Sequence, residues 1–294
     1  MRIAIAGSSG LIGSALVESL RADGHEVLRL VRRPATAPTE VTWDPYKGEI
    51  DLAALAGVDA LINLAGAGVG DHRWTAKYKN TILQSRVKTT ETITKAAAEL
   101  KPAVLINASA IGWYGDTGSS EVDETAPVAS GFLPDVVHQW EAATKPALDA
   151  GVRVVLARTG LVMAAKGGAW AKMLPLFKLG VGGKLGSGKQ YWSFIALADE
   201  ISALKFLLTN SAISGPVNLT APNPATNAEI TKSLGKALRR PTLFPAPAFA
   251  LKLVLGEFSQ EVLGSNRVVP KKLLAAGFTF AHPDIESATR TLLK

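Results

Sequence analysis

The sequence predicts an α/β protein with a doubly wound parallel sheet and a smaller C-terminal α+β domain. In the first 160 residues, short apolar runs alternate with longer amphipathic stretches. Two of these runs, 58–65 and 103–109, are largely apolar, as strands buried on both faces of a parallel sheet are. After Arg158, glycine- and proline-rich segments replace the alternation. We therefore expect one domain over 1–160, to which later segments can return, and a second over 161–294 that includes a terminal module at 244–294.

The first strand leads into a glycine turn. The apolar run Ile3–Ala6 predicts a strand and the amphipathic stretch 11–20 a helix, with G-x-x-G-x-x-G spacing between them. The first glycine permits a tight turn, the second lets a bound group approach the backbone, and the third lets the helix pack closely. Free amides at the start of the helix favour an anion. This context predicts a dinucleotide site, rather than a merely structural turn, formed by Gly7, Ser9, Gly10, Leu11, Ile12 and Gly13.

The second predicted strand, Glu26–Val31, indicates which dinucleotide binds. It ends in Arg32-Arg33-Pro34, at the position where a site that prefers NAD carries an acidic residue for the ribose 2′-hydroxyl. We find no carboxylate there. Guanidinium groups suit a 2′-phosphate, so we predict NADP(H) as the cofactor and Arg32 and Arg33 as its ligands. The alternative is a solvated, basic strand end.

The following segments continue the alternation. A short strand at 41–43 precedes a turn at 45–48, and the buried strand 58–65 ends beside the expected cofactor at Leu64, Ala65 and Gly66. A long helix over 75–100 leads to the strand 103–109, whose last residue, Ser109, we also assign to the cofactor site. A helix over 133–150 and a strand over 152–156 complete the expected sheet, which is of the Rossmann type.

The second half of the chain is less regular. A glycine-rich, basic connection at 180–190 is either a surface loop or a lid over a substrate. Helices are expected over 199–208 and 227–239, followed by a proline-rich connector and the terminal module.

Composition narrows the class of protein. The chain has 294 residues, a net charge of +7, 47% hydrophobic residues and no cysteine. Its basic residues are dispersed, so we expect no nucleic-acid partner, and its four histidines lack metal-ligand spacing, so we predict no metal. The apolar stretch 244–258 is too short and too interrupted to span a bilayer. Because the N-terminus leads directly into the first strand, we expect a cytoplasmic protein with no membrane association.

Several blocks of sequence together resemble the extended short-chain dehydrogenase/reductase superfamily, and within it the atypical branch of nucleoside-diphosphate-sugar epimerase-like, SulA-type proteins. Besides the glycine turn, these blocks are Asn63–Gly66, Ser85-Arg86, Ser109–Gly115, Trp140-Glu141, Leu185–Gln190, Trp192–Ile195, Asn218–Pro222 and the tail from Pro245 through Arg267–Leu273 to Gly277-Phe278. The resemblance implies a Rossmann domain with an NADP site, a domain for a small-molecule substrate, and a C-terminal module of unassigned role.

The resemblance also shows a departure in the catalytic residues. Active members of the superfamily carry a Tyr-x-x-x-Lys pair, in which the lysine lowers the pKa of the tyrosine that moves the proton. When Glu141 is aligned with the glutamate that usually follows this pair, Leu133 and Val137 fall at the two positions. Neither side chain can transfer a proton. The superfamily's serine position falls on Ala110, next to Ser109.

Substitute groups are available near the strand ends. Tyr114 is either a proton donor or a structural residue, and Ser109 either binds substrate or caps the strand end. Arg86, where the superfamily usually has asparagine, either holds a carbonyl or anion or forms a surface ion pair. His138 is a further candidate acid, or a solvated residue of its helix. We assign Tyr114, Ser109 and Arg86 as the candidate catalytic residues.

Two classes of function follow. The first is an NADP-dependent oxidoreductase or epimerase-like protein that acts on a small carbonyl or hydroxyl compound, with a nucleotide sugar among the candidates. The second is a non-catalytic NADP(H)-binding protein that reports redox state to a partner. The intact glycine turn and the substrate domain favour the first, and the missing Tyr-x-x-x-Lys pair favours the second.

Overall fold

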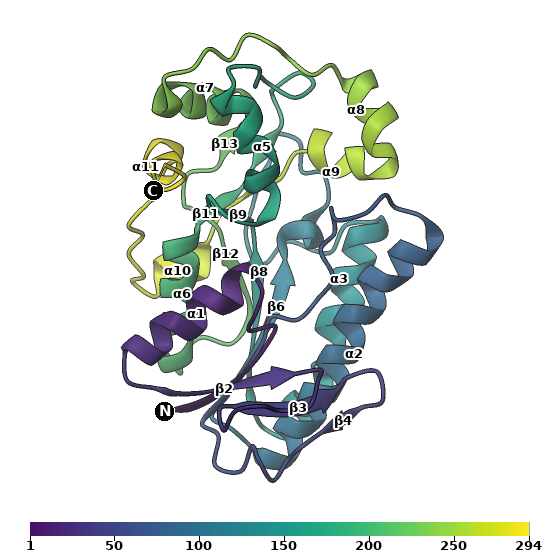
Figure 1. Ribbon diagram of the computed structural model, residues 1–294, viewed down its shortest axis with the longest axis vertical. Coiled ribbons are helices and arrows are strands. Elements are labelled where there is room, and N and C mark those ends of the chain that lie inside the picture. Colours follow the sequence, from purple (N-terminus) through teal and green to yellow (C-terminus); the bar gives the residue numbers. More distant parts are fainter. Residues whose placement is uncertain (294) are drawn as a thin grey trace.

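A computed structural model describes residues 1–293 and centres on an eight-stranded sheet (Figure 1). The strands are β1 Arg2–Ala6, β2 Glu26–Val31, β3 Glu40–Asp44, β4 Glu49–Ile50, β5 Ala60–Asn63, β6 Val104–Ala110, β8 Arg153–Thr159 and β12 Gly215–Leu219. Their order is β12-β8-β6-β5-β1-β2-β3-β4, and all neighbours are parallel except β3 and β4. The order reverses between β1 and β5, as it does at the ligand-binding crevice of doubly wound sheets. The predicted Rossmann-type α/β fold is confirmed.

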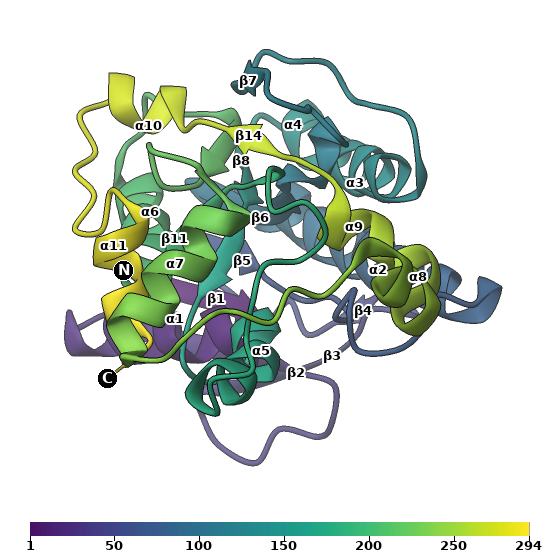
Figure 2. The ribbon, with the colours of Figure 1, turned by 90° about the horizontal axis from the view of Figure 1, so that it is seen from above.

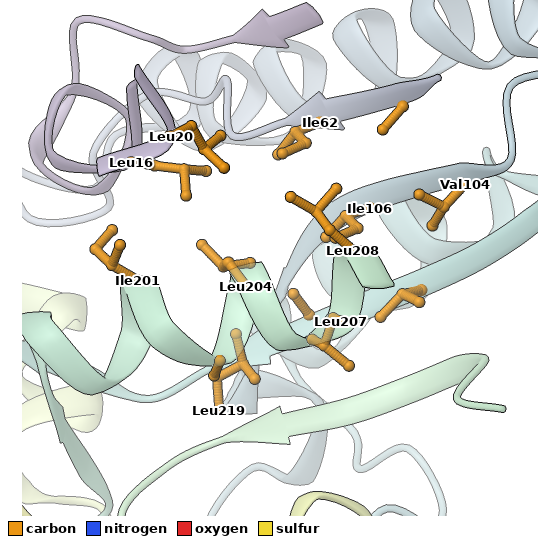
Figure 3. Close-up of a cluster of buried hydrophobic side chains, with 14 of the residues drawn as sticks. Leu16, Leu20, Ile62, Val104, Ile106, Ile201, Leu204, Leu207, Leu208 and Leu219 are labelled. Carbon is orange, nitrogen blue, oxygen red and sulfur yellow. The ribbon is translucent and has the colours of Figure 1, made fainter. Parts of the chain in front are cut away.

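Helices cover both faces of the sheet (Figure 1). One face carries α1 Leu11–Ala22 and α6 Leu197–Thr209, and the other carries α2 Ala76–Leu100, α3 Phe132–Ala142 and α4 Lys145–Asp149. Figure 3 shows leucines of α1 and α6 directed toward apolar side chains of the sheet. Burial of this apolar area, at roughly 25 cal/mol per Å², fixes the first half of the chain to a helix and a strand of the second half.

The remaining elements form a second group, most of which lies beyond the carboxyl edge of the sheet (Figures 1 and 2). One of its helices, Lys271–Ala275, packs against β12 instead. Its strand pairs are β9 Leu161–Met163 with β11 Phe194–Ala196, β10 Tyr191–Trp192 with β13 Ala225–Thr226, and β7 Glu121–Val122 with β14 Arg267–Val268. Its helices are η1 Ile111–Tyr114, α5 Gly168–Lys178, α7 Asn227–Leu238, α8 Ala248–Leu255, η2 Gly256–Phe258, α9 Ser259–Leu263, α10 Lys271–Ala275 and α11 Ile285–Thr291. Among residues 1–293, no helix has both the length and the apolar character needed to cross a bilayer. The domain division near residue 160 stays a prediction, although α6 and β12 return to the sheet as that prediction allowed.

Two segments differ from the sequence-based expectation, and for a third the structure favours one of the two predicted alternatives. The helix expected over 133–150 is two helices, α3 and α4, because Pro146 near the start of α4 has no amide to donate to a continuous helix. The strand expected over 58–65 is confined to β5, at Ala60–Asn63. The glycine-rich connection is tied to the rest of the chain in its second half, since the Gly186 amide donates to the Ala246 carbonyl (2.8 Å) and the Gly188 carbonyl accepts from the Ala228 amide (2.9 Å). These bonds favour a fixed connection over a lid.

Candidate functional site

The glycine turn lies at the carboxyl end of β1, and close backbone contacts account for two of its glycines. Gly7 has a φ of +74°, and a Cβ there would lie 2.6 Å from the carbonyl carbon of Leu64. A Cβ on Gly13 would lie 2.2 Å from the carbonyl oxygen of Gly7. Gly10 differs, because its Cβ would meet only that same oxygen, at 3.3 Å, and both Gly10 and Ser9 are exposed. The turn is therefore tight beneath and open on the side that a ligand can approach.

The start of α1 offers unpaired donors at this open side. Within residues 1–293, the amides of Leu11, Ile12 and Gly13 have no acceptor, and the N-cap Gly10 provides no side chain. The first turn of α1 carries no acidic residue. Unpaired amides and the positive end of the helix dipole together suit a phosphate group. The geometry therefore fits the pyrophosphate of a dinucleotide.

The end of β2 corrects one observation made from the sequence. A carboxylate does lie beside the two arginines: Glu40 of β3 accepts two hydrogen bonds from the Arg33 guanidinium, at 2.8 and 2.7 Å. Arg29 also pairs with Glu40, at 2.5 Å, so this carboxylate is covered although it lies at the periphery of the molecule. The Arg33 bonds, with the Thr36 amide, lower the pKa of Glu40 to about 2. Glu40 is thus held by arginines and does not stand free for a ribose.

The two neighbouring arginines therefore differ. The Arg32 side chain is exposed and forms no hydrogen bond or ion pair within the described chain, whereas Arg33 is committed to Glu40. This corner holds three guanidinium groups, those of Arg29, Arg32 and Arg33, and one carboxylate, that of Glu40. Its net charge is therefore positive. Arg32 is the residue best able to contact a 2′-phosphate.

The end of β5 lies next to the glycine turn, and the segment that follows it packs against the Arg86 side chain. The Leu64 amide donates to the Ala6 carbonyl (3.0 Å), which ties the 64–66 segment to β1. A Cβ on Gly66 would lie 3.4 Å from Arg86 side-chain carbons. Arg86 donates to the Ala67 and Ile82 carbonyls, at 3.0 Å each, and burial lowers its pKa to about 10. Within residues 1–293, Arg86 forms no ion pair. The surface ion pair, one of the two roles expected for Arg86, is therefore not found there.

Five buried side chains form a continuous network, which we call the closed network. The Ser109 hydroxyl donates to Glu141 (2.5 Å), and the Arg158 guanidinium donates to both Glu141 oxygens (2.8 Å each). Arg158 also donates to the Tyr114 hydroxyl (3.0 Å), which in turn donates to Asn218 (2.7 Å). All five residues are less than 9% exposed. The network joins the carboxyl ends of β6, β8 and β12 to α3.

This network bears on two of the candidate catalytic residues. The single proton of the Tyr114 hydroxyl is donated to Asn218, and burial raises its pKa. The Ser109 proton is likewise donated within the protein. The geometry favours the structural alternative for both, while their catalytic assignment stays a prediction. Arg158 was not predicted from the sequence, although a charged residue at the end of an apolar strand is a signal that could have identified it.

The remaining candidate acid lies on the outside of α3. The His138 side chain is exposed, and its ring centroid lies 6.0 Å from that of Trp113. This position favours the solvated-face alternative. Trp113 itself packs against the closed network, since the Arg158 guanidinium lies 4.0 Å from its ring centroid.

A cavity of about 390 Å³ lies between the start of α3 and the terminal module. One wall carries Gly112 of η1 and Leu133 of α3, the residue at the superfamily's tyrosine position. The facing wall comes from α8, α9 and the segment that follows: Lys252, Ser259, Gln260, Glu261, Leu263, Gly264, Ser265 and Asn266. Trp74, Gly115, Asp116, Ser130, Gly131, Phe132 and Pro134 complete the lining. The cavity therefore opens where the superfamily places its catalytic tyrosine.

The fold, the glycine turn and the crevice at the carboxyl edge of the sheet define a Rossmann-type α/β protein. The chain belongs to the NAD dependent epimerase/dehydratase family, whose sequence profile matches residues 3–219. A domain of unknown function (DUF1731) matches residues 246–292, which lie within the predicted terminal module. The resemblance seen in the sequence blocks is thereby confirmed.

Three proteins place the chain within this family. An epimerase family protein of Mycobacterium bovis is 48% identical over 97% of this chain and 95% of its own length. The crystal structure of human epimerase family protein SDR39U1 (isoform 2) with NADPH superimposes with a TM-score of 0.91, at 33% identity and 99% coverage of both chains. A nucleoside-diphosphate sugar epimerase of Corynebacterium glutamicum has a TM-score of 0.82 and 35% identity, over 100% of this chain and 59% of that one.

Proposed function

We propose that this epimerase-family protein binds NADP(H) along the carboxyl edge of its sheet and uses it to interconvert a carbonyl and a hydroxyl group in a small substrate. The observation that carries the proposal is the combination of unpaired α1 amides with the exposed Arg32. The amides fit a pyrophosphate, and the positive corner beside β2 fits a 2′-phosphate. The NADPH bound to the human relative supports the same cofactor.

Other predicted cofactor residues that lie around the turn support the proposal. Gly7, Gly10 and Gly13 shape the turn, and the 64–66 segment forms its neighbouring wall. Bound NADP(H) supplies or accepts a hydride. The chain itself has to bind the cofactor, orient a substrate oxygen and move one proton at that oxygen.

The cavity favours catalysis over binding alone. It offers about 390 Å³ and several polar side chains next to the crevice, which is enough for a small organic substrate. The name of the Corynebacterium glutamicum protein keeps a nucleotide sugar among the candidates. The alternative, a non-catalytic NADP(H)-binding reporter, draws its support from Leu133 and Val137 at the usual catalytic positions.

Cofactor titration tests the proposal. NADPH should bind more tightly than NADH when each is titrated by isothermal calorimetry. Arg32→Ala should weaken NADPH binding about ten- to a hundredfold, because it removes a charge-assisted hydrogen bond worth about 1.5–3 kcal/mol, and should leave NADH binding unchanged. Arg240→Ala is the matched control, since Arg240 is an exposed arginine at the end of α7. Equal affinities of the unmodified protein for both cofactors would contradict the proposal.

A further inference from the structure

The three charged side chains that line the cavity differ in what they already bond. Asp116 accepts hydrogen bonds from the backbone amides of Gly118 (2.9 Å) and Ser265 (3.3 Å). Lys252 reaches the cavity from α8, where it is exposed. The Glu261 carboxyl has no hydrogen bond or ion pair within residues 1–293. Glu261 is therefore the acidic group of this lining that has not been committed to the fold.

The segment that carries Glu261 is anchored on both sides. Before it, Phe258 packs on Trp74, with ring centroids 5.5 Å apart. After it, the Ser265 carbonyl accepts from the Thr117 amide (2.7 Å), and Arg267 of β14 pairs in register with Glu121 of β7. These contacts fix α9 against the segment that follows η1. Glu261 is thus held in place over the cavity by long-range contacts.

The surroundings of Glu261 suit proton transfer. The cavity leaves the side chain accessible to solvent, yet the walls around it raise the pKa of its carboxyl to about 7 by desolvation. Asp116 and Lys252 are the other charged groups that face the cavity. A carboxyl that changes protonation near neutral pH and lines a cavity open to water is suited to act as a general acid or base.

Building on the proposed function, we propose that Glu261 of the terminal module transfers the proton to and from the substrate oxygen, in place of the missing tyrosine, and that the substrate is a small uncharged carbonyl or hydroxyl compound. Leu133, at the tyrosine position, lines the same cavity. A nucleoside diphosphate would bring two phosphates toward two carboxylates opposed by one lysine, which is electrostatically unfavourable.

The proton balance is complete with groups already named. In reduction, the O–H bond of the Glu261 carboxyl breaks and an O–H bond forms on the substrate oxygen. The substrate carbon gains the hydride that bound NADPH supplies, which leaves NADP⁺. The Glu261 carboxylate then regains a proton from water that enters the open cavity. In oxidation the same carboxylate accepts the proton.

Glu261→Gln tests this assignment, with Glu257→Gln as the matched control. Glu257 lies one turn earlier in the same module and pairs with Lys79, outside the cavity lining. The assay follows NADPH oxidation with glyceraldehyde, cyclohexanone, benzaldehyde and the keto form of UDP-4-keto-glucose as probes. On the uncharged carbonyls, Glu261→Gln should lower kcat at least a hundredfold, remove the decline of rate above about pH 7, and leave the Kd for NADPH unchanged. Glu257→Gln should match the unmodified protein in all three.

A readout independent of turnover accompanies the assay. With carbon-13 in the glutamate carboxyls, the NADPH complex should show a carboxyl resonance that titrates near pH 7 and is absent in Glu261→Gln, whereas the resonance of Glu200, whose pKa is about 8, should remain in both proteins. An unchanged kcat and pH profile in that variant would overturn the inference and leave the proposed function standing. Turnover confined to the UDP sugar would overturn the substrate class. Failure of the unmodified protein to bind NADPH would overturn the proposed function instead.

Discussion

The closed network and the cavity share the η1–α3 region, but they use their polar groups in opposite ways. In the closed network, the Tyr114 hydroxyl, the Ser109 hydroxyl and the Glu141 carboxylate all have partners within the protein. In the cavity, the Glu261 carboxyl has none within the described chain. Both regions contain ionisable residues next to the same crevice. The difference teaches that spare hydrogen-bonding capacity, rather than residue type or burial, indicates which group is available for chemistry.

Breaking the closed network should produce the largest effect on stability. Arg158→Met leaves the Glu141 carboxylate buried without its charge partner, and we expect a loss of about 3–5 kcal/mol in the free energy of unfolding. Urea denaturation measures this loss. The double change Arg158→Met with Glu141→Met should recover most of it, because no buried charge remains. A single variant within about 1 kcal/mol of the unmodified protein would contradict the structural role of the network.

Removing one hydroxyl from the network should produce a smaller effect, on stability and not on rate. Tyr114→Phe leaves the Asn218 amide oxygen and one Arg158 donor without this partner, at a cost of about 1–3 kcal/mol. The rate of NADPH oxidation should stay within a few-fold of the unmodified protein. Tyr46→Phe, at a 54% exposed position, is the control for loss of a phenol. A hundredfold drop in kcat with unchanged stability would instead make Tyr114 the proton donor.

The Glu200 carboxyl is bonded through one oxygen, so it lies between the fully bonded closed network and the unbonded Glu261. Its substitution should have the smallest effect on the free energy of unfolding at neutral pH. One of its oxygens accepts from Thr159 (2.9 Å), the other has no partner, and burial raises the pKa of its carboxyl to about 8. The native state therefore holds a proton that the unfolded chain releases above its ordinary pKa of 4.5. Its contribution to stability is complete below that value and is lost as the pH rises toward 8.

The Glu200 effect can be measured as a melting temperature at pH 5 and pH 8. Glu200→Gln should flatten the decline between these values, since the amide cannot release a proton. The exposed Glu99→Gln should leave the decline unchanged. If Glu200→Gln declines as steeply as the unmodified protein, Glu200 does not hold the proton.

The cofactor side of the molecule could be predicted from the sequence because its signals are local. The strand, turn and helix around Gly7 and Gly13 are contiguous in the sequence. At both positions a Cβ would clash with nearby backbone, either of that unit or of the 64–65 segment. The family resemblance likewise rests on short blocks. The doubly wound parallel sheet followed from the alternation of apolar runs with helices, whereas the order of its strands comes from the structure.

Other contacts are encoded by no local pattern. On the cofactor side, Glu40 reaches Arg33 because β2 and β3 are neighbours in the sheet. Arg158 and Glu141 are 17 residues apart, and nothing in either segment marks them as a pair. Glu261 lines the cavity together with Gly112 and Leu133, which come more than 120 residues earlier in the chain. Sequence reasoning could name the missing tyrosine and lysine, but not the group that stands in their place.

A crystal structure of the protein with NADPH and 1-propanol, a small uncharged alcohol, tests the central claim most directly. We predict that the alcohol occupies the cavity with its oxygen within hydrogen-bond distance of the Glu261 carboxyl and beside the nicotinamide. The bond between Arg158 and the Tyr114 hydroxyl should remain intact. A complex in which the Tyr114 hydroxyl has left Arg158 and contacts the alcohol, with Glu261 turned to solvent, would contradict the account.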